Sequence, residues 1–463
     1  MGSGFTTRPG LAMKPLPWQF HKADLPVPGD DETCPIISHP MAKQATGLVV
    51  GVEAQARAAH EAALALQAVP TARKNAALEA IAHEVEAGSG EILEANEKDL
   101  AAARKAKASE AILDRLELNK ARVQAMAKAV HEVVALPDPV GEVSGRWRRP
   151  NGLRIMRQRV PIGVIAFIYE ARPNVTVDAA ALCLKAGNAV ILKGGSEAIN
   201  SNRVLVSRIA RGLAATEFPA AAVQFLDTTD RAAVPALVKM DRWVDLCIPR
   251  GSEDFIQFIK KEATVPVLGH GKGLCHVYVD RAADLKMAEN VVFNAKVSRP
   301  GVCNAMETLL VHADAAPAFL PKAAERLVKA GVELRGDEKA RAIVPSMKAA
   351  TGDDWDEEYL ALVLSVKVVA TVEEAIEHIN RHSSRLSESI ISADRRAVKK
   401  FMDQVDSAVV YHNASTRFTD GGEFGFGAEI GISNARLHAR GPMGLKELTT
   451  HKYLVYGDGQ VRE

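Results

Sequence analysis

The sequence predicts an α/β protein with a Rossmann-like domain, a second α/β domain and a small β element. Short apolar runs alternate with helical stretches through the middle of the chain, which is typical of right-handed βαβ crossovers in a parallel sheet. The 463 residues are 47% hydrophobic, enough to bury two or three cores. An Asn151-Gly152 pair between β-like alternations predicts a hairpin over residues 146–160.

The first part of the chain predicts an extension followed by helices. Residues 1–40 contain seven prolines and little apolar periodicity, so we expect a disordered extension, with Met41 as a natural start. From Gly51 to Leu136, apolar residues recur at three- and four-residue spacing in an Ala-, Leu-, Glu- and Lys-rich stretch. This spacing indicates several amphipathic helices.

Two sets of strands and helices follow. The first set has expected strands at Val164–Tyr169, Ala189–Leu192, Val223–Phe225 and Val244–Ile248, and helices near Val175–Lys185, Glu197–Thr216 and Asp230–Lys239. The second set has strands at Thr308–Val311 and Val363–Val369, and helices at Ala316–Ala330 and Val372–Ile379. Each set predicts a parallel sheet covered on both faces. The segment from Gly421 to Gly444 is glycine-rich, which favours loops that approach a ligand closely.

Composition argues against several classes of function. The net charge is +1 and no long basic run is interleaved with aromatic residues, so we expect no nucleic-acid or membrane partner. No apolar stretch reaches the ~18 residues of a membrane span. The five cysteines form no C-x-x-C pair, which argues against a disulfide framework and a structural zinc site. We therefore expect a cytoplasmic protein without a metal.

Cys303 is the candidate nucleophile. It follows a Pro-Gly turn and precedes a stretch that can become a helix. A thiol at a helix start beside Arg299 has its thiolate favoured by the helix dipole and by a fixed positive charge. The alternative is a buried, inert cysteine that acts as a small hydrophobe.

Two turns at strand ends are candidate phosphate sites, although no G-x-G-x-x-G motif follows any strand. One turn is Lys193-Gly-Gly-Ser196-Glu197, which offers an ammonium, flexible backbone and a hydroxyl. The other is Pro249-Arg-Gly251-Ser252, where Ser252 can cap a helix whose start would bind pyrophosphate. Glycine-rich turns of this kind are common, so either alone is a weak indication.

Asn174 is a further candidate, in the segment Tyr169-Glu-Ala-Arg-Pro-Asn174-Val-Thr. It can serve as a simple helix N-cap, worth ~1 kcal/mol. Its side-chain amide can instead donate to an oxyanion on a substrate bound to Cys303. The residues alone leave both roles open.

These segments together carry a resemblance. The blocks Val160–Asp178, Lys193–Asn202, Arg299–Asn304, His412–Phe418 and Gly425–Gly431 closely resemble the gamma-glutamyl phosphate reductases, a family of the aldehyde dehydrogenase superfamily. The resemblance extends from about Val50 to the C-terminus. It implies an aldehyde dehydrogenase-like fold with an NADP-binding domain over 41–143 and 156–268 and a catalytic domain over 269–420. Residues 144–155 and 421–463 would then form an oligomerisation element and a C-terminal segment.

The resemblance also implies roles for single residues. Cys303 would be the nucleophile, and Asn174 with the backbone N–H of Cys303 would form the oxyanion hole. The cofactor-binding residues, with Glu358 at the nicotinamide ribose, would be Lys193, Ser196, Gly251, Ser252 and Glu358. Arg172, Arg299 and Arg417 are candidate substrate cations, with Glu170, Asp420 and Glu423 as candidate ammonium partners; each can instead form a structural ion pair.

The implied reaction is reduction of L-glutamyl 5-phosphate to L-glutamate 5-semialdehyde by NADPH through a Cys303 thioester, the second step of proline synthesis. Hydrolytic relatives carry a water-activating glutamate, where this chain has Gly269-His270-Gly-Lys-Gly273. The lack of a base there suits a thioester that must survive until hydride arrives. His270 can act in acid–base chemistry or merely satisfy a carbonyl.

Other interpretations remain open. An NAD-dependent hydrolytic aldehyde dehydrogenase would need a base that this segment does not offer. A non-catalytic nucleotide-binding partner of glutamate kinase would not need Cys303, Asn174 and Lys193 together. We expect a homo-oligomer, with a transient contact to glutamate kinase.

Overall fold

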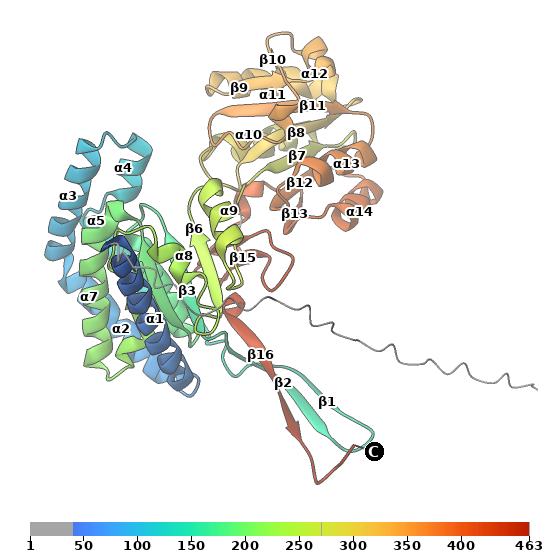
Figure 1. Ribbon diagram of the computed structural model, residues 1–463. Coiled ribbons are helices and arrows are strands. Elements are labelled where there is room, and N and C mark those ends of the chain that lie inside the picture. Colours follow the sequence, from blue (N-terminus) through green and yellow to red (C-terminus); the bar gives the residue numbers. More distant parts are fainter. Residues whose placement is uncertain (1–39, 270, 463) are drawn as a thin grey trace, which may run out of the picture. The chain divides into compact units, whose positions relative to one another are not determined.

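The computed structural model describes residues 40–269 and 271–462 (Figure 1). The unit Ala45–Glu463 holds every element below except the start of the first helix. The extension expected over residues 1–40 falls almost wholly outside the described residues, and so does His270.

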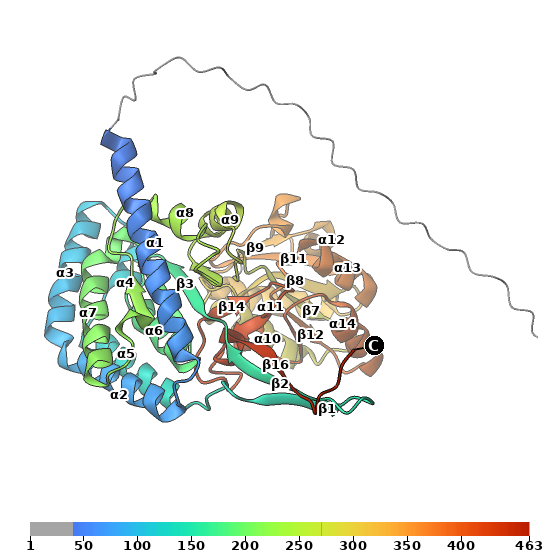
Figure 2. The same cartoon turned by 60° about the horizontal axis from the view of Figure 1, so that its bottom comes forward.

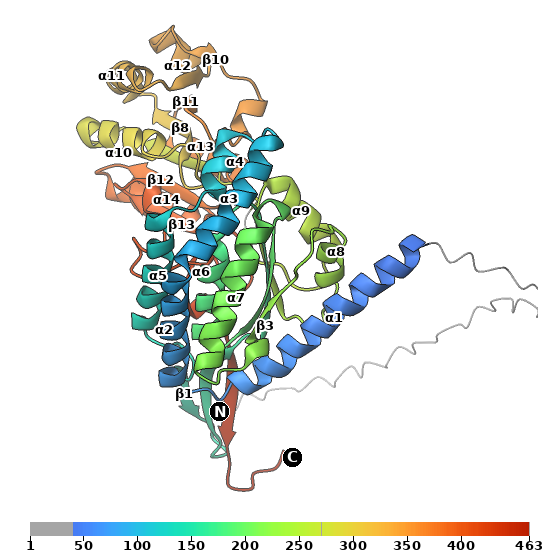
Figure 3. The same ribbon diagram turned by 90° about the vertical axis from the view of Figure 1, so that its left-hand side faces the viewer.

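The predicted amphipathic helices are confirmed. They are α1 (Pro40–Leu66), α2 (Thr71–Ala87), α3 (Ser89–Lys105), α4 (Glu110–Leu116) and α5 (Lys120–Ala135). Figure 3 shows α2, α3 and α5 beside α7 (Ile199–Ala215) as a layer of helices. On α2, Leu78, Ile81 and Val85 are buried at three- and four-residue spacing, so one stripe faces the core.

The first sheet is parallel and has the order β5-β4-β3-β6. Its strands are β3 (Val164–Tyr169), β4 (Ala189–Gly194), β5 (Val223–Phe225) and β6 (Leu246–Arg250). The helices that follow these strands are α6 (Asn174–Lys185), α7, α8 (Ala233–Leu237) and α9 (Glu253–Glu262). All six residues of β3 and of β4 are buried, as expected of central strands covered on both faces.

The second sheet is also parallel, with the order β10-β9-β11-β8-β7-β12-β13. Its strands are β7 (Cys275–Val279), β8 (Met306–His312), β9 (Glu333–Gly336), β10 (Lys348–Ala349), β11 (Val363–Val369), β12 (Ser387–Ile391) and β13 (Val409–His412). The helices are α10 (Leu285–Val297), α11 (Ala316–Lys329), α12 (Glu338–Ile343), α13 (Val372–His382) and α14 (Arg395–Gln404). Two clusters of buried apolar residues pack against this sheet. The predicted fold class, with two α/β sheets, is confirmed.

Two antiparallel sheets complete the fold. The hairpin expected around Gly152 consists of β1 (Val143–Arg148) and β2 (Arg154–Pro161), and Gly152 has a φ of +96°. The strand β16 (Thr449–Tyr456) pairs with β2, and Figure 2 shows the two side by side. The second pair is β14 (Gly431–Ser433) with β15 (Gly441–Met443). Among the helices described, none is long and apolar enough to cross a membrane.

Candidate active site

The strand order of the first sheet creates a topological switch point at its carboxyl edge. From β3 the chain continues to β4 on one side, whereas β6 lies on the other side of β3. Ligands of open α/β sheets bind at such a switch point. The loops that begin there carry Glu170–Asn174 after β3 and Gly251–Ser252 after β6. Several of the sequence-predicted residues therefore meet at one edge of one sheet.

The carboxyl end of β4 offers a buried cation. Lys193 is 6% exposed, and its Nζ donates to the carbonyl of Gly194 at 2.7 Å. Burial lowers the pKa of Lys193, while Glu197 opposes that shift. Nearby, Nδ2 of Asn202 is buried without a partner among the described residues. The exposed Ser196 begins a short 3₁₀ helix. An ammonium with one carbonyl partner can bind a further acceptor, so this strand end fits a nucleotide.

The loop after β6 differs from expectation. Ser252 occupies the N-cap position of α9, but its side chain makes no capping hydrogen bond. Its N–H donates instead to Oε2 of Glu170 at 3.1 Å. A Cβ at Gly251 would come within 2.8 Å of the side chains of Glu170 and Phe255, so a larger residue there would force them to shift. A carboxylate thus holds the helix start that the sequence assigns to pyrophosphate.

The surroundings of Cys303 correct the sequence argument. Cys303 lies in a turn before β8, so a strand and not a helix follows it, and no helix dipole favours its thiolate. Burial raises the pKa of Cys303 to about 11. The cation that most opposes this shift is Arg250 rather than Arg299, and the carboxylates of Glu358 and Glu429 reinforce it. The sequence missed Arg250 although its motif, Pro249-Arg250-Gly251-Ser252, is a candidate phosphate turn.

Gly273 connects Cys303 to Glu358. A Cβ at Gly273 would come within 2.3 Å of Cα of Cys303, so only glycine fits there. The N–H of the same glycine donates to Oε1 of Glu358 at 2.9 Å. Sγ of Cys275 donates to the carbonyl of Cys303 at 3.3 Å. The sequence argument that no carboxylate serves the segment 269–273 is therefore incomplete, because Glu358 reaches it from far along the chain.

Asn174 begins α6 as its first residue and is not the N-cap. Its Nδ2 donates to Oδ2 of Asp178 at 3.0 Å, one turn along the helix. Burial raises the pKa of Asp178 to about 6, and the hydrogen bond from Asn174 opposes that shift. One N–H of the Asn174 amide is thus bound to the carboxyl group of Asp178, and the second N–H remains available.

Arginine side chains gather around Cys303. Arg172, Arg250 and Arg299 make no side-chain hydrogen bond or ion pair with any described residue. Burial lowers the pKa of Arg172, and the charges of Arg250 and Arg299 add to that effect while Cys303 opposes it. Nε of Arg417 donates to Ser298 at 3.1 Å, and its guanidinium also contacts Asn304. Unpaired like charges of this kind fit an anionic ligand.

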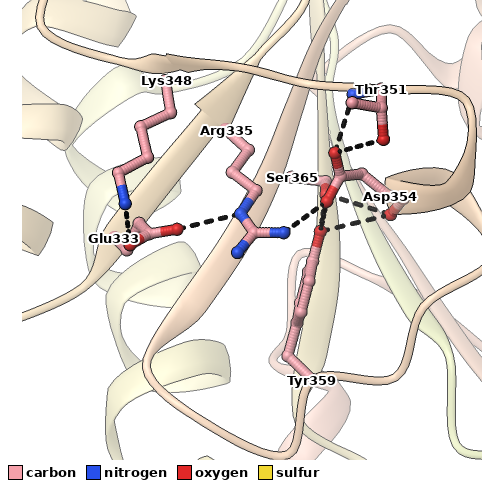
Figure 4. Close-up of polar contacts among 7 residues, drawn as sticks. All are labelled: Glu333, Arg335, Lys348, Thr351, Asp354, Tyr359 and Ser365. Atoms are coloured by element: carbon pink, nitrogen blue, oxygen red, sulfur yellow. Dashed lines mark hydrogen bonds and ion pairs between the residues drawn. The ribbon is translucent and has the colours of Figure 1, made fainter.

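The segment that carries Glu358 is held by a polar network (Figure 4). Asp354 is 6% exposed and accepts from Arg335 and from the hydroxyl of Tyr359, each at 2.7 Å. Burial opposes ionisation of Asp354, but hydrogen bonds from Thr351, Arg335 and Tyr359 outweigh it and hold its pKa well below the usual range. Because Tyr359 adjoins Glu358, the network fixes the backbone next to that carboxylate.

A buried ion pair supports the same segment. Nζ of Lys296 lies 2.6 Å from Oε2 of Glu307, and both side chains are fully buried. Oε1 of Glu307 accepts the N–H of Leu360 at 3.3 Å. Burial raises the pKa of Glu307 to about 7, against the charge of Lys296. The Glu358 segment is therefore fixed on both sides of Tyr359.

The fold has two parallel α/β sheets, and the charge of Arg250, at the carboxyl end of β6, acts on Cys303. Comparison with known proteins shows the class of enzyme to which the chain belongs. The sequence profile of the aldehyde dehydrogenase family matches residues 29–351 and 347–453, so the chain belongs to that family. It is 53% identical over 412 residues to the gamma-glutamyl phosphate reductase of Moorella thermoacetica, covering 89% of this chain and 99% of that protein.

Two further comparisons point the same way. The gamma-glutamyl phosphate reductase of Syntrophomonas wolfei is 54% identical over 408 residues, covering 88% of this chain and 97% of that protein. The crystal structure of gamma-glutamyl phosphate reductase from Thermotoga maritima superposes with a TM-score of 0.87 at 51% identity, covering 90% of this chain and all of that one. The resemblance inferred from the motifs is confirmed.

Proposed function

We propose that this chain reduces L-glutamyl 5-phosphate to L-glutamate 5-semialdehyde and phosphate, with NADPH as reductant, as the second step of proline synthesis from glutamate. The observation that carries this proposal is a cysteine surrounded by unpaired arginines, in a chain that is 51–54% identical to gamma-glutamyl phosphate reductases. An acyl phosphate has an electrophilic carbonyl carbon and an anionic leaving group, which suit these two features.

Cys303 supplies the nucleophile. Its thiolate adds to the carbonyl carbon of the acyl phosphate, the carbon–oxygen bond to phosphate breaks, and a thioester forms. The positive charge of Arg250 favours that thiolate against the effect of burial. Arg172, Arg299 and Arg417 would bind the anionic groups of the substrate, since their guanidinium groups lie within electrostatic reach of one another and of Cys303.

Two donors would stabilise the oxyanion that forms at the carbonyl. The amide of Asn174 has one N–H bound to Asp178 and one left over. The backbone N–H of Cys303 forms no hydrogen bond with another described residue, and it interacts with the thiolate of Cys303 itself. Donors aimed at developing charge lower the barrier more than any other single contribution.

The cofactor would be held by Lys193, Ser196, Gly251, Ser252 and Glu358. When bound, NADPH supplies the hydride that reduces the thioester carbonyl. Lys193 would face the 2′-phosphate of the adenosine ribose, because its buried ammonium has a single backbone partner. Oε2 of Glu358 remains free for a ribose hydroxyl, since Oε1 is bound to Gly273.

The surroundings of the site also bear on partners. The sheet β1-β2-β16 exposes Trp147, Tyr453 and Val455, with 43%, 60% and 54% of each accessible. An apolar surface on a small sheet is typical of an interface, so we propose a homo-oligomer built through it. A cytoplasmic location and a transient contact with glutamate kinase stay part of the proposal.

Cys303→Ala tests the nucleophile. Turnover should fall below ~1% of wild type, because the covalent step has no other thiol at this position. Affinity for NADPH, measured by fluorescence titration, should stay nearly unchanged. Cys247→Ala is the matched control, since Cys247 is buried in β6 and outside the proposed site. A Cys303→Ala enzyme with substantial turnover would exclude the thioester route.

A further inference from the structure

We propose that Arg250 and Glu429 together bind the α-amino-acid group of the substrate, with the guanidinium on the α-carboxylate and the carboxylate on the α-ammonium. This inference rests on the proposed function, because it specifies how the same site would select a glutamyl substrate. It adds two residues to those that the sequence indicated.

The guanidinium of Arg250 packs against a glycine. Arg250 ends β6, and a Cβ at Gly431 would come within 2.6 Å of its Nη1. The guanidinium therefore lies against the backbone of Gly431, whose φ of +151° also favours glycine. The side chain is half-buried and makes no hydrogen bond or ion pair with any described residue. A half-buried cation without a partner has a strong preference for an anionic ligand.

Glu429 lies two residues before that glycine and is positioned in a similar way. Its Oε2 accepts the N–H of Gly421 at 2.9 Å. A Cβ at Gly421 would come within 2.7 Å of Cβ of Glu429, so a larger residue at 421 would displace the carboxylate. The other oxygen, Oε1, accepts no hydrogen bond from any described residue. One oxygen thus anchors the side chain and the other is available to an ammonium.

Both charges are within electrostatic reach of the reacting sulfur. Arg250 and Glu429 each influence the titration of Cys303, and the charge of Arg250 opposes the rise that burial gives to the pKa of Glu429. They nevertheless do not form an ion pair with each other within the described chain. A zwitterion placed between two separated opposite charges neutralises both. In a glutamyl substrate, only two methylene groups separate the reacting carbonyl from the α-carbon, so this group must bind close to Cys303.

The other three carboxylates considered for the ammonium either accept backbone N–H groups or are exposed to solvent. Oε2 of Glu170 accepts the N–H of Ser252. Oδ1 of Asp420 accepts two backbone N–H groups of its own turn, from Gly422 and Glu423. Glu423 itself is exposed. Of these four carboxylates, Glu429 has the strongest electrostatic effect on Cys303, so it is the one that we assign to the ammonium.

Substrates that lack one charged group test the assignment. The purified full-length enzyme would be assayed in the oxidative direction with NADP and phosphate on glutamate 5-semialdehyde, on its analogue without the amine, 5-oxopentanoate, and on its analogue without the carboxylate, 4-aminobutanal. The readout is the ratio of kcat/KM between substrates, which cancels any uniform loss of activity.

In Glu429→Gln, the preference for glutamate 5-semialdehyde over 5-oxopentanoate should fall about 10- to 100-fold, because a charge-assisted hydrogen bond to the amine is lost. The preference over 4-aminobutanal should fall similarly in Arg250→Gln. Glu447→Gln is the matched control: Glu447 is also half-buried and accepts a glycine N–H, that of Gly444 at 2.9 Å, and its ratios should match wild type. If Glu429→Gln does not fold, Glu429→Asp should retain part of the preference.

The outcomes separate the two proposals. A wild-type enzyme without phosphate-dependent turnover of glutamate 5-semialdehyde would reject the proposed function. A wild-type enzyme with that activity, together with Glu429 variants that slow all three substrates by one factor, would overturn the amino-acid subsite alone.

Discussion

Cys303 shows how far single residues can be interpreted from the sequence. The motif identifies the thiol as a candidate, but it does not reveal that burial raises its pKa to about 11. The opposing charge comes from Arg250 on β6, and Glu358 and Glu429 come from still other segments. Such contributions depend on which distant residues the fold brings together, so local sequence cannot supply them.

The rate of alkylation of Cys303 should report this pKa. In the enzyme without ligands, the rate constant for iodoacetamide should keep rising with pH up to ~10, because only the thiolate reacts. In Arg250→Gln it should be lower at every pH below that range, since the favouring charge is gone. The rate can be followed by mass spectrometry of the Cys303 peptide. A plateau near pH 7 would show a thiolate that is already formed.

Asp178 predicts a pH dependence of stability. Its pKa is raised from 3.8 to about 6, so the folded state holds the proton more tightly than the unfolded state. Stability from this group is thus present below pH 4 and is lost as pH rises through 6, by about 3 kcal/mol. Asp178→Asn, which has no such group, should match wild type near pH 4 and be more stable at pH 8 in urea unfolding.

A second readout distinguishes function from packing at Asp178. The same variant should have a lower kcat with little change in KM, because an asparagine can both donate and accept and so no longer selects one orientation of the Asn174 amide. A variant less stable than wild type at pH 8 would contradict the raised pKa.

At the scale of elements, the segment 353–360 illustrates a different limit. Resemblance placed Glu358 near the cofactor, and the structure brings that side chain to Gly273. The network that supports Glu358 joins Asp354 to Arg335, which lies on β9, and to Ser365, which lies on β11. No periodicity in the sequence links these residues, since their partnership depends on the order of strands in the sheet.

Removal of Asp354 should loosen this segment. Asp354→Ala removes one acceptor from Arg335 and one from the hydroxyl of Tyr359, which keep Glu333 and Ser365 as partners. We therefore expect a loss of about 1–3 kcal/mol in urea unfolding and a raised KM for NADPH. Lys348→Ala is the matched control, because its ion pair with Glu333 in the same network is 67% exposed on the lysine side and should contribute under ~1 kcal/mol (Figure 4). Equal effects of the two variants would show that the network does not position Glu358.

For the whole molecule, apolar patterns predicted much of the architecture. The strands β3, β5 and β11 have the predicted bounds, because continuous apolar runs mark buried parallel strands. The strand β12 was missed because its sequence, Ser-Glu-Ser-Ile-Ile, is half polar; Glu388 is fully buried there and accepts the N–H of His276 at 2.7 Å. The pairing of β16 with β2 was missed too, since nothing local specifies a partner about 290 residues away in sequence.

We propose above all that the sulfur of Cys303 exchanges an acyl group with phosphate through a thioester that is protected from water. With glutamate 5-semialdehyde and NADP but no phosphate, NADPH should appear as a burst of at most one equivalent per active site and then nearly stop. Addition of phosphate should start steady turnover, because phosphate releases the acyl group from Cys303. Steady NADPH formation without phosphate, with glutamate as the product, would contradict the account and show that a group such as Glu358 activates water.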